Sequence, residues 1–354
     1  MLEARFPQFF TSHGTTGQID GKVHDLFTVT GNPEAPNCTL SQPNFNTANS
    51  FGDIVFRIPT PVFGAGFVEN IGEDTLINFH NGEVGNAFGV SGTFNYNNND
   101  GTISRFGWKA QNKSTLLFAG EAYNVEMGIT NELFPNERPN PDEENNLVGL
   151  PSGCLNLTGT GYPEDTTPID TSKSGTAASS DITMFAIFMR LLEQPTARPN
   201  GYSTASTTVT AASIARGQTA FSTVGCAACH APSLTTDTSN IDSELTHATA
   251  HLYSDLEIHH MGGLADNISQ GTAMGDQFRT APLWGVGQRI FFLHDGRTSN
   301  ILTAITPDHC LTPSNGFQPS EACTAEQNFL ALPATSGNNN ATSQQDVLNF
   351  LRSL

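Results

Sequence analysis

Apolar residues recur with a helical period just before Pro195, in a stretch of otherwise polar chain. Spacings of three and four residues place one side chain above another on a single helix face. The residues that make up this repeat are Met184, Ile187, Phe188, Leu191 and Leu192. The pattern predicts an amphipathic helix that buries this face and ends before the proline.

Two further helical patterns occur in the second half of the chain. One contains Gly217 and Phe221, and the other closes the chain after Ser343, with Asp346 three residues later as in a capping box. The last pattern presents one apolar face, made of Val347, Phe350, Leu351 and Leu354. We predict that these helices cross, with glycine allowing close approach and the two phenylalanines in contact. The alternative is two unrelated surface helices.

The pattern divides the chain into a loop-rich first half and a more helical second half. Residues 1–170 are rich in Gly, Asn, Pro and Phe, and residues 201–210 are rich in Ser, Thr and Ala, as in a linker. We predict an N-terminal unit at 1–175, a helix and linker at 176–210, and a C-terminal unit at 211–354. The expected fold class is mainly α, with an irregular N-terminal half.

The chain is strongly acidic, with 15 Lys and Arg against 34 Asp and Glu and a net charge of −19. Such a surface repels nucleic acid and anionic membranes and favours a basic protein partner. Solubility in a salt-rich environment is the alternative explanation. No apolar run reaches the length of a membrane span, and the opening residues MLEARFPQFF do not resemble a signal peptide.

Four of the six cysteines lie apart in loop-like sequence, which is typical of disulfides formed in an oxidising compartment. Cys310 and Cys323 enclose 12 residues, and a bridge there is worth about 3 kcal/mol. Cys38 and Cys154 are then the remaining pair. The alternative is four free thiols in a cytosolic protein.

The other two cysteines form the motif Cys226-Ala-Ala-Cys229-His230. Two thiols at this spacing can form thioethers with the two vinyl groups of one porphyrin, and the next residue then offers its imidazole to the iron. The competing interpretations are half a zinc site or a redox dithiol. Neither the extra zinc ligands nor a βαβ context is visible, so the motif favours a c-type haem.

The second axial ligand of that iron is less closely defined by the sequence. We expect Met261, which lies among polar and glycine residues where a buried core methionine would be unusual. The other candidates are Met274, His259, His260 and His294. Arg279 is expected to pair with a haem propionate, although a surface ion pair would explain it equally well.

Several ordered segments carry a family resemblance. GCAACH, YSDLEIHHMGGLAD, FRTAPLWGVG and FFLHDGRT resemble the C-terminal haem domain of di-haem peroxidases. RFGWKAQ, FAGEAYNVEMGITNELFPNE and MFAIFMRLL are similar to one branch, the di-haem oxidoreductases, sometimes labelled thiol oxidoreductases. The resemblance covers most of residues 50–354. It implies a mainly helical bacterial protein of two domains, with a cytochrome c-like C-terminal domain and one haem in each domain.

The resemblance also implies roles for individual residues. Electrons enter such proteins at the C-terminal haem and pass to the N-terminal haem, where peroxide is reduced. The acid of that second site corresponds to Glu126 in Asn124-Val125-Glu126-Met127, and the tryptophan between the haems resembles Trp108. Glu126 would move a proton between the peroxide oxygens; otherwise it is a solvated carboxylate near a helix end.

The chain departs from the family pattern in two places. It has one Cys-x-x-Cys-His where the family has two, and Cys38 alone cannot attach a haem through two thioethers. We therefore expect an N-terminally truncated chain with a second haem motif upstream. Relatives bind calcium through an Asn before a Pro-Thr, but the corresponding FRIPTP has Arg57 and Ile58, which gives calcium little support.

These patterns together predict a periplasmic c-type haem oxidoreductase that resembles di-haem peroxidases. Its expected partners are a small soluble electron donor, either a cytochrome c or a copper protein, and a small oxidant such as peroxide. The alternative is a mono-haem electron-transfer or sensor protein without peroxidase activity. An oxidising compartment follows from the loop cysteines and from the assembly that covalent haem requires.

Overall fold

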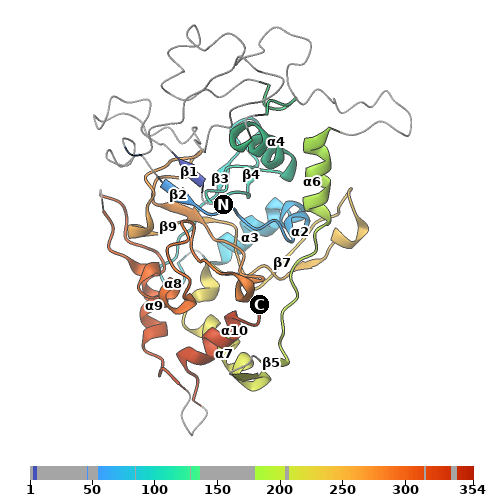
Figure 1. The fold of residues 1–354 in the computed structure, drawn as a ribbon. Helices are drawn as coiled ribbons and strands as arrows, with labels where there is room; N and C mark the ends of the chain where they lie inside the picture. Colours follow the sequence, from blue (N-terminus) through green and yellow to red (C-terminus); the bar gives the residue numbers. More distant parts are fainter. Residues whose placement is uncertain are drawn as a thin grey trace.

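Figure 1 shows the computed structural model of the chain. It describes residues 3–5, 46, 55–83, 85–127, 129–135, 180–203, 207–314, 316–335 and 341–354. The described α helices are short, from 5 to 13 residues, and alternate with two-stranded antiparallel ladders. The expectation of a mainly α protein is therefore correct only in part, because the described structure is mixed. Cys38 and Cys154 lie outside the described residues.

The N-terminal half has helices that pack around small side chains. Its helices are α2 (Ala65–Asn70), α3 (Glu73–Glu83), α4 (Thr115–Glu126) and α6 (Asp181–Leu191). Its strands are β1 (Glu3–Arg5), paired with β2 (Val55–Arg57), and β3 (Asn95–Tyr96), paired with β4 (Ile103–Ser104). Serine side chains cap two of the helices, Ser114 for α4 and Ser180 for α6, which satisfies backbone N–H groups that the first turn leaves free.

The predicted helix before Pro195 is confirmed as α6, but its predicted buried face is wrong. Met184, Phe188 and Leu191 are 53%, 57% and 55% exposed. The buried face carries Ile182, Ala186 and Met189 instead, at spacings of four and three residues.

The reason is close backbone packing between α6 and its neighbours. A Cβ atom added to Gly66 of α2 would lie 2.1 Å from the carbonyl oxygen of Arg190 in α6. One buried cluster joins α6 to its neighbours, and its members are Ala65 of α2, Ala119 of α4, and Ile182 and Met189 of α6. The small Ala186 lies on the same buried face of α6. A face lined with Met and Phe would hold the helices further apart.

The C-terminal half joins short elements by long ordered loops. Its α helices are α7 (Ala211–Thr223), α8 (Ile301–Ile305), α9 (Cys323–Leu330) and α10 (Gln344–Leu351). The strand pairs are β5 (Gly201–Ser203) with β6 (Thr208–Thr210), β7 (Leu234–Thr235) with β8 (Thr249–Ala250), and β9 (Ile258–His260) with β10 (Gln277–Arg279). The 3-10 turns are η1 (Cys226–Ala228), η2 (Ser243–Leu245), η3 (Gly262–Leu264), η4 (Val286–Gln288) and η5 (Asp308–Cys310).

The predicted crossing of two helices is confirmed in α7 and α10, which lie together near the C-terminus in Figure 1. A Cβ atom at Gly217 would lie 2.0 Å from the carbonyl oxygen of Asp346, so only glycine allows this approach. The rings of Phe221 and Phe350 are 5.4 Å apart, edge to face. Ser343 and Asp346 form the capping box at the start of α10.

One buried cluster draws on both halves of the chain. It joins Ile71, Leu76 and Phe94 to Leu252 and Trp284. Isolated β-bridges link the same regions, from Ile71 to Thr236 and from Thr93 to Ile258. The two halves therefore share apolar core, and the domain boundaries drawn from the sequence remain a prediction.

Two other expectations concern the cysteines and the membrane. The sulfur atoms of Cys310 and Cys323 lie within bonding distance, as the predicted bridge requires. Among the described helices, none combines the length and the apolar character needed to cross a bilayer.

Substitution of Gly217 by alanine should lower the free energy of unfolding by about 2 kcal/mol, because the new methyl group forces α7 and α10 apart. Urea unfolding followed by circular dichroism measures this loss. Gly82 in α3 is the matched control, since a Cβ there meets no atom within 4 Å. Gly82→Ala should be neutral or slightly stabilising. Equal stability of Gly217→Ala and the unmodified protein would contradict the close crossing.

Candidate functional site

A largely apolar cavity of about 210 Å³ lies among the C-terminal elements. Its apolar wall comes from α7, α8, α9, α10 and the strands between them, and includes Phe221, Leu283, Ile301, Phe329 and Leu351. Its polar lining includes Cys226, Cys229, His230, His259, Arg279, Arg289, His294 and His309. An apolar cavity with a few convergent polar groups is the usual form of a cofactor site.

The cysteine motif reaches the cavity because α7 ends immediately before it. Gly225 has a φ of 106°, a left-handed conformation that glycine adopts without strain, and it turns the chain into η1. The backbone N–H of His230 then donates to the carbonyl of Cys226 at 2.9 Å, which closes one turn. Both thiols are free of disulfides and lie with His230 on the cavity wall.

The two thiols are in a setting that opposes thiolate chemistry. Burial, followed by the proximity of Cys229, raises the pKa of Cys226 to about 12. Burial also raises the pKa of Cys229. Reactive dithiols need the opposite, a depressed pKa in an electropositive and accessible place. The redox-dithiol interpretation is therefore disfavoured, whereas neutral buried thiols are compatible with alkylation by a cofactor held in the cavity.

His230 is oriented as a metal ligand. Its Nδ1 lies 3.0 Å from the carbonyl oxygen of Tyr253, which can only accept, so Nδ1 carries the hydrogen. Burial lowers the pKa of His230 to about 4, which keeps the imidazole neutral and Nε2 unprotonated. A histidine whose Nδ1–H is held by a backbone carbonyl offers Nε2 to a metal ion.

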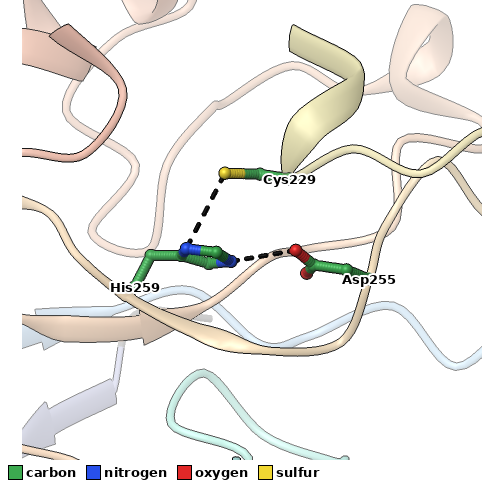
Figure 2. A group of neighbouring side chains, drawn as sticks. All are labelled: Cys229, Asp255 and His259. Atoms are coloured by element: carbon green, nitrogen blue, oxygen red, sulfur yellow. Dashed lines mark hydrogen bonds and ion pairs between the residues drawn. The ribbon is translucent and has the colours of Figure 1, made fainter. Parts of the chain in front are cut away.

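Figure 2 shows His259 between the thiol of Cys229 and the carboxylate of Asp255. Its Nδ1 lies 3.7 Å from Cys229 Sγ and its Nε2 lies 2.9 Å from Asp255 Oδ2. A second carboxylate, Glu321, lies 3.0 Å from Nδ1. Burial alone would lower the pKa of His259, but the proximity of Cys229 and the contacts of the imidazole with Asp255 outweigh burial and raise that pKa well above its usual value.

Three of these side chains, Cys229, Asp255 and His259, are close enough together to be considered as ligands of a metal ion. An imidazolium that donates from both nitrogens to carboxylates has no lone pair for a metal. His259 therefore serves better as a cationic bridge that ties the cysteine motif to Asp255 and Glu321. The zinc interpretation of Cys229 is weakened for this reason.

The structure separates the candidates for the second axial ligand. Met261 lines the cavity, as does His294, whose ring stacks on Phe278 at 4.2 Å. Met274 is 52% exposed and does not line the cavity. His260 donates from Nδ1 to the carboxylate of Asp276 and accepts at Nε2 from the side-chain amide of Gln277. Of the residues proposed from sequence, Met261 and His294 thus remain close to the cavity with side chains not engaged by carboxylates.

Two guanidinium groups line the cavity and form no ion pair with a carboxylate of the described residues. Arg279 donates from Nε to the carbonyl of Gly107 at 2.8 Å, and Arg289 donates to that of Pro282 at 3.3 Å. Burial lowers the pKa of each to about 10. Among the described residues, neither has an acid within ion-pair distance. Uncompensated cations in an apolar cavity match the propionate groups of a haem, so the donor set fits this cofactor.

Trp108 and Glu126, the two residues expected to act in catalysis, lie in different places. Trp108 lines the cavity, donates from Nε1 to the carbonyl of Ile58 at 2.7 Å, and stands edge-on to His294. Glu126 is exposed at the end of α4 and is not among the cavity residues. The structure therefore joins Trp108 to the C-terminal site and leaves Glu126 outside it.

The FRIPTP segment, where relatives were expected to bind calcium, holds a buried protein cation instead. Arg57 is fully buried, forms an ion pair with Asp266, and donates to Gln270 at 2.7 Å. Lys109 Nζ lies 3.2 Å from the other oxygen of Asp266. Because two cations already neutralise this carboxylate, a calcium ion beside Asp266 would meet net repulsion.

Sequence reasoning missed three contributors to the site. They are the carbonyl of Tyr253, the second guanidinium at Arg289, and His309 beside the C-terminal cysteine pair. Arg289 carried a signal of its own, since it follows FRTAPLWGVG at short distance in a chain with few basic residues. The other two depend on how distant segments fold together.

Comparisons with known proteins bear on the family of the chain. The model of the family described as "Di-haem oxidoreductase, putative peroxidase" matches residues 10–341. No curated protein matches the chain. Among solved structures, hydrazine synthase of Kuenenia stuttgartiensis, pressurised with xenon, is 18% identical with a TM-score of 0.27, over 51% of this chain and 58% of that one, too weak a similarity to support an argument. The family match covers most of the sequence, and the chain belongs to the di-haem oxidoreductase family.

Proposed function

We propose that this protein is a c-type haem oxidoreductase that carries its haem in the C-terminal cavity. Cys226 and Cys229 would hold the porphyrin by thioethers, and His230 would bind the iron through Nε2. The observation that supports this most is the convergence of two neutral thiols, an oriented imidazole and two guanidinium groups on one apolar cavity, where neither guanidinium has a carboxylate partner among the described residues. When bound, the haem supplies a one-electron couple between ferrous and ferric iron.

The residues of the chain would tune and protect that couple. Arg279 and Arg289 would neutralise the propionates, and the apolar wall would exclude water. Met261, which lines the cavity, is the thioether that the sequence predicts as a further iron ligand. Trp108, on the cavity wall, would stand on the route to the N-terminal half.

The full reaction of the family would need a second haem. We infer that a reduced small cytochrome or copper protein donates electrons at the C-terminal haem, and that peroxide is reduced at an N-terminal haem beside Glu126. The net charge of −19 favours a donor with a basic surface. A periplasmic location suits covalent haem assembly and the Cys310–Cys323 pair. Calcium is not part of the proposal, because Arg57 and Lys109 already neutralise Asp266.

A mono-haem electron-transfer or sensor protein is the second candidate. One observation favours it: the sequence contains one Cys-x-x-Cys-His. In that case electrons would enter and leave through the same C-terminal haem.

Covalent haem should disappear when Cys226 and Cys229 are both replaced by alanine, because no thioether can then form. Both proteins are matured in a periplasm with a c-type haem assembly system, and the covalent haem is counted by pyridine haemochrome. The unmodified protein should contain one haem for this motif, and the variant should contain none. The matched control removes Cys310 and Cys323 together and should keep the haem. Haem retained by the Cys226/Cys229 variant would refute the attachment site.

Arg279→Gln should lower the reduction potential of the haem by about 40–60 mV, or roughly 1 kcal/mol for one electron. A buried positive charge disfavours the more positive ferric form, so its removal favours oxidation. Spectroelectrochemical titration measures the shift. Arg297, an exposed residue paired with Asp295 outside the cavity, is the control. An unchanged potential in Arg279→Gln would argue against contact with the propionates.

Glu126→Gln should reduce peroxide turnover about 100-fold or more, because a general acid–base group is lost. Steady-state oxidation of a reduced small cytochrome by peroxide measures the rate. Glu83, partly exposed at the end of α3, provides the control variant Glu83→Gln. Equal turnover by Glu126→Gln would exclude the acid role, and no turnover by the unmodified protein would favour the carrier alternative.

A further inference from the structure

His309 is a cavity histidine that neither the motif nor the family resemblance singles out. It belongs to η5 (Asp308–Cys310) and lines the same cavity as the cysteine motif. Its Nδ1 lies 2.5 Å from the carbonyl oxygen of Ala304, so Nδ1 carries the hydrogen. Within the described part of the chain, Nε2 has no hydrogen-bond partner. His230 has the same arrangement, with Nδ1 on a carbonyl and no partner for Nε2 among the residues that the structure describes.

The hydrogen bond to Ala304 has a simple structural origin. Ala304 lies in the last turn of α8 (Ile301–Ile305), where backbone carbonyls lack partners within the helix. Donation from Nδ1–H satisfies one of them and selects the tautomer with a lone pair on Nε2. This is the setting that a metal-binding imidazole requires.

The backbone around His309 is held from several directions. Ser320 Oγ donates to the carbonyl of His309 at 2.5 Å, and the next residue, Cys310, lies within bonding distance of Cys323 in α9. The N–H of Gly263 in η3 donates to the carbonyl of Leu311 at 3.1 Å. A Cβ at Gly262 would lie 2.9 Å from that same carbonyl oxygen, so η3 and η5 are in close contact. These contacts hold the imidazole in place before a metal binds. A flexible thioether side chain lacks such support.

The other cavity histidines are less suited to this position. His259 is engaged at both nitrogens by Asp255 and Glu321. His294 stacks on Phe278, and no hydrogen bond of its ring to a described residue orients either nitrogen. His230 and His309 both line the cavity, so the two imidazoles border a common space.

We propose that His309, through Nε2, is the second axial ligand of the iron bound by His230, in place of the methionine that the sequence suggests. The inference rests on the proposed haem attachment at Cys226 and Cys229. Two imidazoles leave no open position on the iron and give a lower reduction potential than an imidazole and a thioether. The C-terminal haem would then transfer electrons and would not bind peroxide.

The unmodified protein, matured with its haem in the periplasm, provides the first test. Near-infrared magnetic circular dichroism and electron paramagnetic resonance of the ferric protein distinguish two imidazoles from an imidazole and a thioether. We expect a low-spin bis-imidazole signal without the thioether-to-iron charge-transfer band. A thioether band, or a five-coordinate high-spin signal from this haem, would overturn the proposal without any variant being made.

Variants then identify the residue. His309→Ala should keep one covalent haem per attachment motif, lose the low-spin signal completely, and regain it when imidazole is added. Met261→Ala, His294→Ala and the exposed His251→Ala should leave the ferric spectrum as it is. Loss of the signal in Met261→Ala or His294→Ala, or its persistence in His309→Ala, would refute the assignment.

The pyridine haemochrome separates this inference from the proposed function. If the unmodified protein contains no covalent haem, the attachment proposal itself fails. If it contains haem with a thioether ligand, attachment holds and only the His309 assignment fails. Should His309→Ala fold poorly, the spectra of the unmodified protein still decide between the two ligands.

Discussion

The close crossing of α7 and α10 at Gly217 is the contact on which the C-terminal site depends. It brings Phe221 against Phe350 and places Val347 and Leu351 of α10 on the cavity wall. Gly225, just after α7, lies on the same wall. Because the cysteine motif follows α7 directly, the position of this helix sets where both thiols and His230 lie. A bulkier residue at Gly217 would move α7, and with it the proposed attachment point.

Inside that frame, the site is organised by which polar groups have partners. Asp255 and Glu321 share the single cation of His259, and Asp266 is paired with Arg57 and Lys109. Arg279 and Arg289 have no such carboxylate among the described residues. An apolar cavity tolerates uncompensated cations only when something else supplies the negative charge. A haem with two propionates meets that requirement, and membership of the di-haem oxidoreductase family is consistent with it.

The two halves of the molecule are joined rather than independent, and this affects how the site is built. Ile71, Leu76 and Phe94 share a core with Leu252 and Trp284. Trp108, from the N-terminal half, contributes to the cavity wall formed by the C-terminal half. Electron flow between the halves, if both carry a haem, would therefore cross continuous packed protein.

The sequence by itself determined the features that depend on neighbouring residues: the Cys226-Ala-Ala-Cys229-His230 motif, the capping box at Ser343, and the helix that ends before Pro195. It also predicted the Gly217 crossing, because glycine and aromatic residues at helical spacing carry that information locally. The tertiary structure alone decided that α6 buries Ala186 rather than Phe188, since close backbone packing outweighed apolarity. It alone brought the carbonyl of Tyr253 to His230, and Arg289 and His309 to the cavity, because such convergence depends on the path of the chain between distant residues.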